Sequence, residues 1–416
     1  MQPAVTPRTM QRAGIASVTL TVLFLAAACS QPAQTSQPAR TGQPVQTDQT
    51  QAGGAAAQAP QTAAPPRTMM SPMASLEVVH ATYVDVAGNL ADLRSRVARW
   101  EQGDAGSLNI AKEKAERLRA LLRHATWPPA MTGPVTKIAT ALEPVEQALK
   151  AQDLAAAQQQ LDAIQEYTED LEHDFYDTWV PAHKGAPLSP MTVHAGYLDL
   201  SANLSGLRSH IAAWEQGDQE SLGIASEKAE RIEALLHNMP WPGPLAEPIE
   251  QIETGLPAVV KGLKAKDMAA TKQALAPVSE AAHDLTHDFY GKWMAQAKGM
   301  TSDAACVQMA YLDLSANVSD LRARIGQWEQ GDEASLNTAK EKIERVNAVL
   351  THTDWPEGMT AATTTIAAVV QPVEQALKAK DVAAAKQALT TMGEAPHDLT
   401  HVFYDKWLMG PMMQTP

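Results

Sequence analysis

The sequence has little cysteine, no excess of positive charge and none of the common catalytic motifs, and each shortage excludes a class of protein. Two cysteines in 416 residues cannot build a disulfide framework. Acidic residues outnumber basic ones by 47 to 33, and without a broad basic patch a nucleic-acid partner is excluded. CxxCH, HExxH, CxxC, GxSxG and glycine-rich phosphate loops are all missing from the sequence. We therefore predict a protein that is not an enzyme.

The first 28 residues have the features of an export signal. Arg8 and Arg12 precede an apolar run of 13 residues, Ile15 to Ala27, which is too short to cross a bilayer. The run ends in Leu25-Ala-Ala-Ala-Cys29, which resembles the lipobox of bacterial lipoproteins. The resemblance implies that Cys29 carries fatty acyl chains such as palmitate and anchors the protein to a membrane of the cell envelope, facing the periplasm or the outside. The alternative is ordinary cleavage after Ala26-x-Ala28, which would give a secreted protein.

Residues 29–75 are rich in Gln, Pro, Thr, Ala and Gly and have almost no large apolar side chains. Such a segment cannot bury enough surface to offset its conformational entropy. We predict a disordered tether between the lipidated Cys29 and the folded part of the chain.

The remainder repeats with a period of 114 residues. Six aromatic positions recur at this spacing, and the first of them is Tyr83, Tyr197 and Tyr311. So long a period indicates three tandem domains rather than a solenoid of short repeats, and each is large enough to fold alone. We place them at residues 76–180, 190–294 and 304–409.

Each copy has helical periodicity throughout. In the second copy, apolar residues at steps of three and four follow one helix face from Val193 to Trp214. Gly217 suits a helix C-terminus and Asp218 the N-cap of a second helix at about 219–238. A third, proline-interrupted helix is expected at about 245–265 and a fourth at about 268–294. The sequence therefore predicts an all-α protein made of three up-down-up-down four-helix bundles.

Three further patterns recur in every copy. The aromatic residues on the helical stripes, such as Trp100, Phe175 and Trp179, are predicted to be core side chains. Asp85 and Asn89, repeated 114 and 228 residues later, are four apart beside the first stripe and are predicted to bond across helices. The phrase HDLTHDFYGKW at 283–293 returns with changes at 169–179 and 397–407.

The size of the module, an ALKAxD phrase before its last helix and a His-x-x-Tyr near its end resemble the soluble b-type four-helix cytochromes. The resemblance implies a last-helix haem ligand at His173, His287 or His401. A helical wheel points these side chains away from the core, and the corresponding first-helix methionine is missing. Haem binding is therefore the weakest of the three functional hypotheses.

Histidines one helical turn apart can share a metal ion, and an antiparallel bundle places the start of helix one beside the end of helix four. We therefore expect metal-ligand sets of His194, His283 and His287 in the second copy, and of His80, Glu169 and His173 in the first. The third copy offers His397 and His401 with Gln308 or Met309. Such nitrogen-rich sets suit zinc or copper, and the second copy should bind most tightly. The methionine clusters at 69–73 and 409–413 resemble copper(I)-binding motifs.

The leading functional hypothesis is a non-enzymatic envelope lipoprotein whose three bundles bind a protein partner or another envelope component. Transition-metal binding through the histidines at the bundle ends is the alternative.

Overall fold

The computed structural model describes residues 75–297 and 304–408, and it is helical throughout these ranges. The predicted signal peptide, Cys29, the tether and both methionine clusters lie outside the described residues. Within the described part of the chain, no helix combines the length and the apolar character needed to span a bilayer. The all-α prediction is confirmed.

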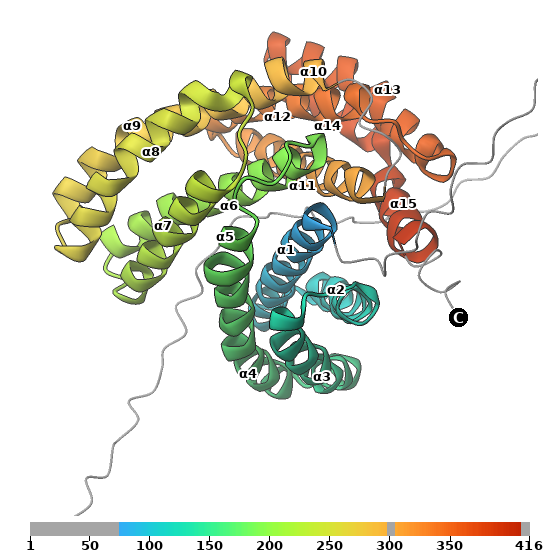
Figure 1. The fold of residues 1–416 in the computed structure, drawn as a ribbon. Helices are drawn as coiled ribbons and strands as arrows, with labels where there is room; N and C mark the ends of the chain where they lie inside the picture. Colours follow the sequence, from blue (N-terminus) through green and yellow to red (C-terminus); the bar gives the residue numbers. More distant parts are fainter. Residues whose placement is uncertain (1–74, 298–303, 409–416) are drawn as a thin grey trace, which may run out of the picture. The chain divides into compact units, whose positions relative to one another are not determined.

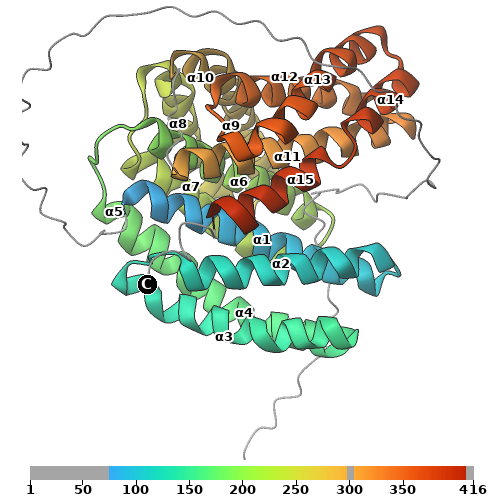
Figure 2. The same ribbon diagram turned by 90° about the vertical axis from the view of Figure 1, so that its right-hand side faces the viewer.

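The helices form three modules (Figures 1 and 2). Each has four helical segments, and in module 3 the fourth segment is divided into two helices at Gly393. Module 1 contains α1 (Leu76–Glu101), α2 (Ala105–His124), α3 (Pro129–Ala151), and α4 (Leu154–His173) with its extensions η1 (Asp174–Trp179) and α5 (Val180–Ala182). Module 2 contains α6 (Pro190–Glu215), α7 (Glu220–Asn238), α8 (Gly243–Lys264), and α9 (Met268–Asp288) with η2 (Phe289–Trp293) and α10 (Met294–Gln296). Module 3 contains α11 (Ala304–Glu329), α12 (Glu333–His352), α13 (Glu357–Ala379), α14 (Val382–Met392), α15 (Ala395–His401) and η3 (Val402–Leu408).

The turn between the first two helices of module 2 follows the prediction except that the N-cap of α7 is Gln219, one residue after the predicted Asp218. Gly217 has a φ of 102°, which a residue with a side chain rarely adopts. The Asp218 carboxylate accepts a hydrogen bond from the backbone N of Glu220 at 3.1 Å and another from the Ser221 hydroxyl at 2.7 Å. These bonds satisfy donors that the start of α7 would otherwise leave free. Modules 1 and 3 repeat the turn with glycine and aspartate at 103, 104, 331 and 332.

The third helix differs from the expectation in one respect. α8 is continuous from Gly243 to Lys264, with Pro248 and Pro257 inside it, rather than interrupted. Each proline removes one backbone donor and favours a kink, yet α8 buries an apolar face against α9 along its length. Packing therefore keeps the helix in one piece where propensity alone would break it.

The core of each module centres on a pair of stacked rings from its first and last helices. Tyr197 lies nearly parallel to Phe289 with ring centroids 3.7 Å apart, and Trp293 also stacks on Phe289 with centroids 4.9 Å apart. Phe289 is fully buried. The same stack joins the corresponding residues of modules 1 and 3. The prediction that these aromatics are core residues is confirmed for Phe175 and Trp179, whereas Trp100 and Trp407 are only partly buried and pack against the core.

The end of the last helix widens into a π-helix in all three modules, which the sequence did not lead us to expect. The wider turn begins at or next to the Phe-Tyr pair. Phe175 points into its own core, while Tyr176 is buried against the next module. π-helical turns are rare and often occur at functional positions. Here the π-helical turn allows Phe175 to be buried in its own module and the next residue, Tyr176, to be buried against the following module.

A half-buried ion cluster between the first two helices occurs in modules 1 and 3 and is lost from module 2. Asp320 contacts Lys342 at 2.9 Å and Arg324 at 3.3 Å, and module 1 has the same arrangement at Asp92. In module 2 the aspartate is replaced by Gly206 and the arginine by His210. Lys228 therefore packs over a glycine, and burial lowers the pKa of its ammonium group.

Restoring the aspartate should stabilise module 2. A Cβ at Gly206 would meet only the side chain of Lys228, at 3.4 Å, so there is room for the change. We expect Gly206→Asp to raise the free energy of unfolding by about 0.5–1 kcal/mol, through helix propensity and the pair with Lys228. Gly206→Asn is the matched control, because it changes propensity without the charge. Chemical denaturation of both variants checks this, and equal values would show that the ion pair contributes nothing.

His210 should make module 2 sensitive to acid. Burial, and next the positive charge of Lys228, lower the pKa of His210 to about 4. The pKa of an ordinary histidine is about 6.5. Because the pKa of His210 is lower than this, the folded state favours the neutral ring. Its contribution to stability is present above about 6.5 and is lost as the pH falls towards 4. We expect His210→Gln to flatten that part of the curve of unfolding free energy against pH. An unchanged acid limb in this variant would contradict the prediction.

Candidate functional site

The structure separates the histidines that we expected to act together. His80 and His194 are completely buried. The last-helix residues of the predicted sets, namely Glu169, His173, His283, His287, His397 and His401, are exposed. Among the residues that the structure describes, no three His, Cys, Asp or Glu side chains are grouped so that they could hold a metal ion. The predicted three-ligand sets are therefore not assembled.

His194 is buried because the start of α6 is covered on every side. All seven residues from Met191 to Tyr197 are buried, although a helix with one apolar face would expose half of them. The helix packs in its own bundle and also contacts α1 and α11, the first helices of the other two modules. His194 does lie near the end of the last helix, 5.2 Å from the ring of Phe289. Its Nε2, however, faces the next module.

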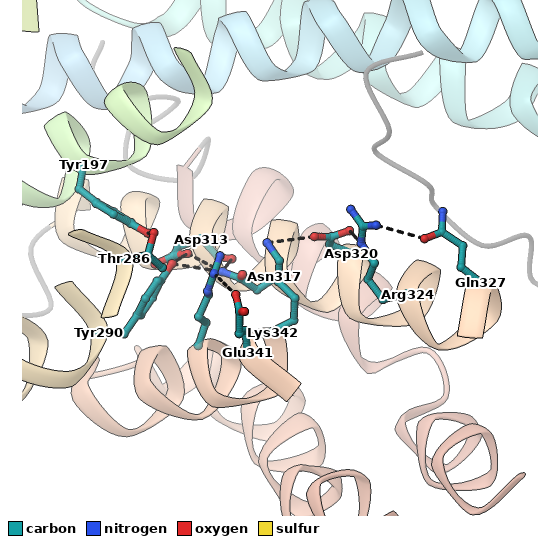
Figure 3. A network of polar contacts seen from close by, with 11 residues as sticks. Tyr197, Thr286, Tyr290, Asp313, Asn317, Asp320, Arg324, Gln327, Glu341 and Lys342 are labelled. Carbon is teal, nitrogen blue, oxygen red and sulfur yellow. Dashed lines mark hydrogen bonds and ion pairs between the residues drawn. The ribbon is translucent and has the colours of Figure 1, made fainter. Parts of the chain in front are cut away.

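The partner of His194 is a buried carboxylate of module 3. Nε2 of His194 lies 2.9 Å from Oδ2 of Asp313, while Oδ1 of Asp313 accepts bonds from the Tyr290 hydroxyl at 2.5 Å and from Nδ2 of Asn317 at 2.6 Å. Figure 3 shows Tyr290 and Asn317 converging on Asp313. Two of the three donors belong to module 2, so the carboxylate joins two modules. Buried charges are tolerated only when they are hydrogen-bonded in this way.

The same constellation occurs at all three junctions and closes a cycle. Asp199 of module 2 is bonded by His80 at 2.9 Å and Tyr176 at 2.5 Å, both from module 1. Asp85 of module 1 is bonded by Tyr404 at 2.7 Å and by Nε2 of Gln308 at 2.8 Å, both from module 3. Glutamine thus replaces histidine at the junction that returns the chain to its first module. We call these three sites the junction carboxylates.

An arginine of the second helix covers each junction tyrosine. The guanidinium carbon of Arg345 lies 5.7 Å from the ring centre of Tyr290, and the pairs Arg231–Tyr176 and Arg117–Tyr404 are similar at 5.6 and 5.1 Å. Burial, followed by the nearby carboxylate, raises the pKa of Tyr290 well above its ordinary value. The tyrosine therefore stays protonated and acts as a hydrogen-bond donor. Burial likewise raises the pKa of Asp85.

The junctions are enclosed, hydrogen-bonded polar sites. Their carboxylates are enclosed, every oxygen accepts at least one hydrogen bond, and the tyrosines are held in the protonated form. The sequence did contain a signal for them, because the Asp-Asn pair recurs at four-residue spacing in every copy. The pair does bond across helices, because the Tyr176 hydroxyl donates to Asp199 at 2.5 Å and lies 3.1 Å from Nδ2 of Asn203. Asn203 also donates to Asp199 within α6 at 2.8 Å. The tyrosine and histidine partners were missed because they come from a neighbouring module.

The exposed last-helix histidines form pairs in two modules. Nε2 of His283 and Nε2 of His287 lie 3.2 Å apart, and the distance between His397 and His401 is 3.1 Å. Their exposure confirms the helical wheel, which turned them away from the core where the cytochrome resemblance would need a ligand. Module 1 has Glu169 in place of the first histidine. Gln308 and Met309, expected to complete the third set, are both buried.

Comparisons with protein-family models, with curated proteins and with solved structures find no match for this chain.

Replacing His194 by alanine or by glutamine should separate the two parts of its role. Alanine leaves a buried carboxylate oxygen without its donor and opens a cavity, so we expect a loss of about 2–4 kcal/mol in unfolding free energy. Glutamine reproduces the junction that Gln308 makes with Asp85 and should cost less than about 1.5 kcal/mol. Denaturation of the full chain tests this. If the two variants lose the same unfolding free energy, the hydrogen bond to Asp313 does not account for the contribution of His194 to stability.

Proposed function

We propose that this chain is a non-enzymatic lipoprotein of the cell envelope, which presents three helical bundles as one body to a binding partner. The observation that carries the proposal is the cycle of junction carboxylates. It gives the repeated polar residues a structural role, and it accounts for the Asp, His and Tyr side chains that could otherwise suggest catalysis. The outward faces of the bundles are then the parts of the molecule left for recognition.

The chemistry of those outward faces favours a polar partner. Among the described residues, Leu188 and Ile224 are the large apolar side chains that are exposed, at 53% and 36%. Two scattered side chains do not make an apolar docking patch. With a net charge of −14 for the whole chain, the body suits a protein or envelope component that offers basic and hydrogen-bonding groups.

Binding of a transition metal is the second candidate function. The observation that favours it is the pair of exposed imidazoles one turn apart in modules 2 and 3, with nitrogen atoms 3.2 and 3.1 Å apart. Zinc and copper(II) both accept imidazole ligands. The two functions are compatible, because the histidine pairs lie on the surface and the junction histidines do not take part in either.

The lipid anchor is tested by Cys29→Ser. Acyl chains supply the apolar energy of membrane binding that the Gln/Pro/Thr-rich tether lacks, so the variant should leave the membrane fraction and stay folded. Fractionation of cells with and without the substitution, together with circular dichroism of the released protein, measures both. Chemical cross-linking in intact cells should join the anchored wild type to an envelope component. A wild type that is soluble without detergent would support simple secretion instead.

A further inference from the structure

We propose that module 3 contains a copper(II)-selective surface site, in which His397 and His401 are the ligands and Asp405 is a positioning residue. The proposal rests on the second candidate function and deepens it, because it states which module binds, which ion and why. It also replaces the expectation that module 2 binds most tightly. That expectation depended on His194, which is buried at a junction and bonded to Asp313.

The two imidazoles already have the separation that a shared ion requires. Nitrogen ligands lie roughly 2.0–2.1 Å from a bound ion, so two adjacent ligands are about 3 Å apart. Nε2 of His397 and Nε2 of His401 are 3.1 Å apart, and both side chains are exposed. The two nitrogens therefore need little change in separation to share an ion. Half of the His401 side chain is open to solvent, at 48%, so water can fill the remaining coordination positions.

Asp405 fixes the tautomer of His401. Its Oδ2 lies 2.9 Å from Nδ1 of His401, and because a carboxylate only accepts, the ring proton must be on Nδ1. The lone pair of Nε2 then points towards His397, where the metal would sit. A carboxylate behind a metal-binding histidine orients the ring and raises its basicity, and loss of such a partner typically costs about 10–100-fold in affinity.

The three modules provide natural variants of this arrangement. Module 3 has both the histidine pair and the aspartate. Module 2 has the pair, His283 and His287, but Gly291 stands where the aspartate would be. Module 1 has Asp177 beside His173, but Glu169 replaces the other imidazole. Only module 3 combines two imidazoles with a carboxylate that orients one of them.

The carboxylates around His287 do not give module 2 the orienting partner that Asp405 provides in module 3. Hollows beside His287 are lined by Asp288 on one side and by Glu341 on the other. Asp288 is paired with Lys292 at 2.6 Å, and Glu341 is paired with Arg345 at 2.9 Å. Asp288 and Glu341 are therefore neutralised. The same hollows are also lined by Glu247, Asp284 and Glu344, and none of the five carboxylates is hydrogen-bonded to the ring of His287 in the way that Asp405 holds His401.

The donor set selects the ion. Two imidazole nitrogens with water suit copper(II), nickel and zinc, whereas calcium and magnesium prefer oxygen ligands. Along the first-row series a given nitrogen site binds copper(II) most tightly. Imidazole must be neutral to coordinate, so acid should release the ion.

The test is a titration of the full mature chain with copper(II) against a competing chelator, followed by electron paramagnetic resonance. We expect two classes of site, with module 3 about 10-fold tighter than module 2, and signals typical of two nitrogen ligands. His401→Ala should remove the tight class, and His287→Ala the weak one. The double variant gives the background from the rest of the chain.

A matched exchange tests the role of Asp405. Asp405→Gly should lower the affinity of module 3 to that of module 2, while Gly291→Asp should raise module 2 by about the same factor. A merely structural role for Asp405 would leave the affinity for copper unchanged. If the two modules bind copper with equal affinity and neither exchange changes it, the assignment to module 3 is overturned but metal binding stands. Binding no greater than in the double variant would overturn metal binding altogether.

Discussion

The fold depends on a carboxylate that no single module can satisfy. An aspartate removed from water loses several kcal/mol of hydration, and only well-placed donors recover it. At each junction one such donor, the asparagine, comes from the aspartate's own helix, while the tyrosine and the histidine or glutamine come from the preceding module. Each module therefore completes the buried polar site of the next. The bundles are repeated in sequence but are not independent in energy.

This dependence explains why sequence reasoning described the modules better than their junctions. Helical periods, glycine turns, aspartate caps and stacked aromatics are set by residues close in the chain or within one bundle. Gly217 could be assigned from local chemistry, and its turn conformation is confirmed, whereas the N-cap of α7 is Gln219, one residue after the predicted Asp218. His194, Asp199 and Asn203 are polar residues beside an apolar stripe, and such residues normally face solvent. Their burial is decided by helices of the neighbouring modules, about 114 residues away in the sequence. Apolar residues spaced at steps of three and four within one helix do not reveal such contacts.

At the candidate site, too, the sequence predicted what depends on one helix and missed what depends on contacts between helices. The wheel correctly placed His283 and His287 on the surface, because that depends only on the geometry of one helix. It could not show that the end of the last helix widens into a π-turn. That turn sends Phe289 into its own core and Tyr290 to the junction. The proposed metal set failed where it needed a third residue from another helix.

Divergence among the copies shows which positions the architecture requires. Every copy keeps the tyrosine, aspartate and asparagine of the junction, whereas the remaining donor is histidine twice and glutamine once. Both supply one N–H at the same place, so the fold requires the bond and not the imidazole. The exposed pair differs from the junctions, because the packing of module 3 does not require a histidine at 397 or 401. Two imidazoles with their Nε2 atoms 3.1 Å apart on an open surface stabilise the fold little, so the packing does not explain why both are present.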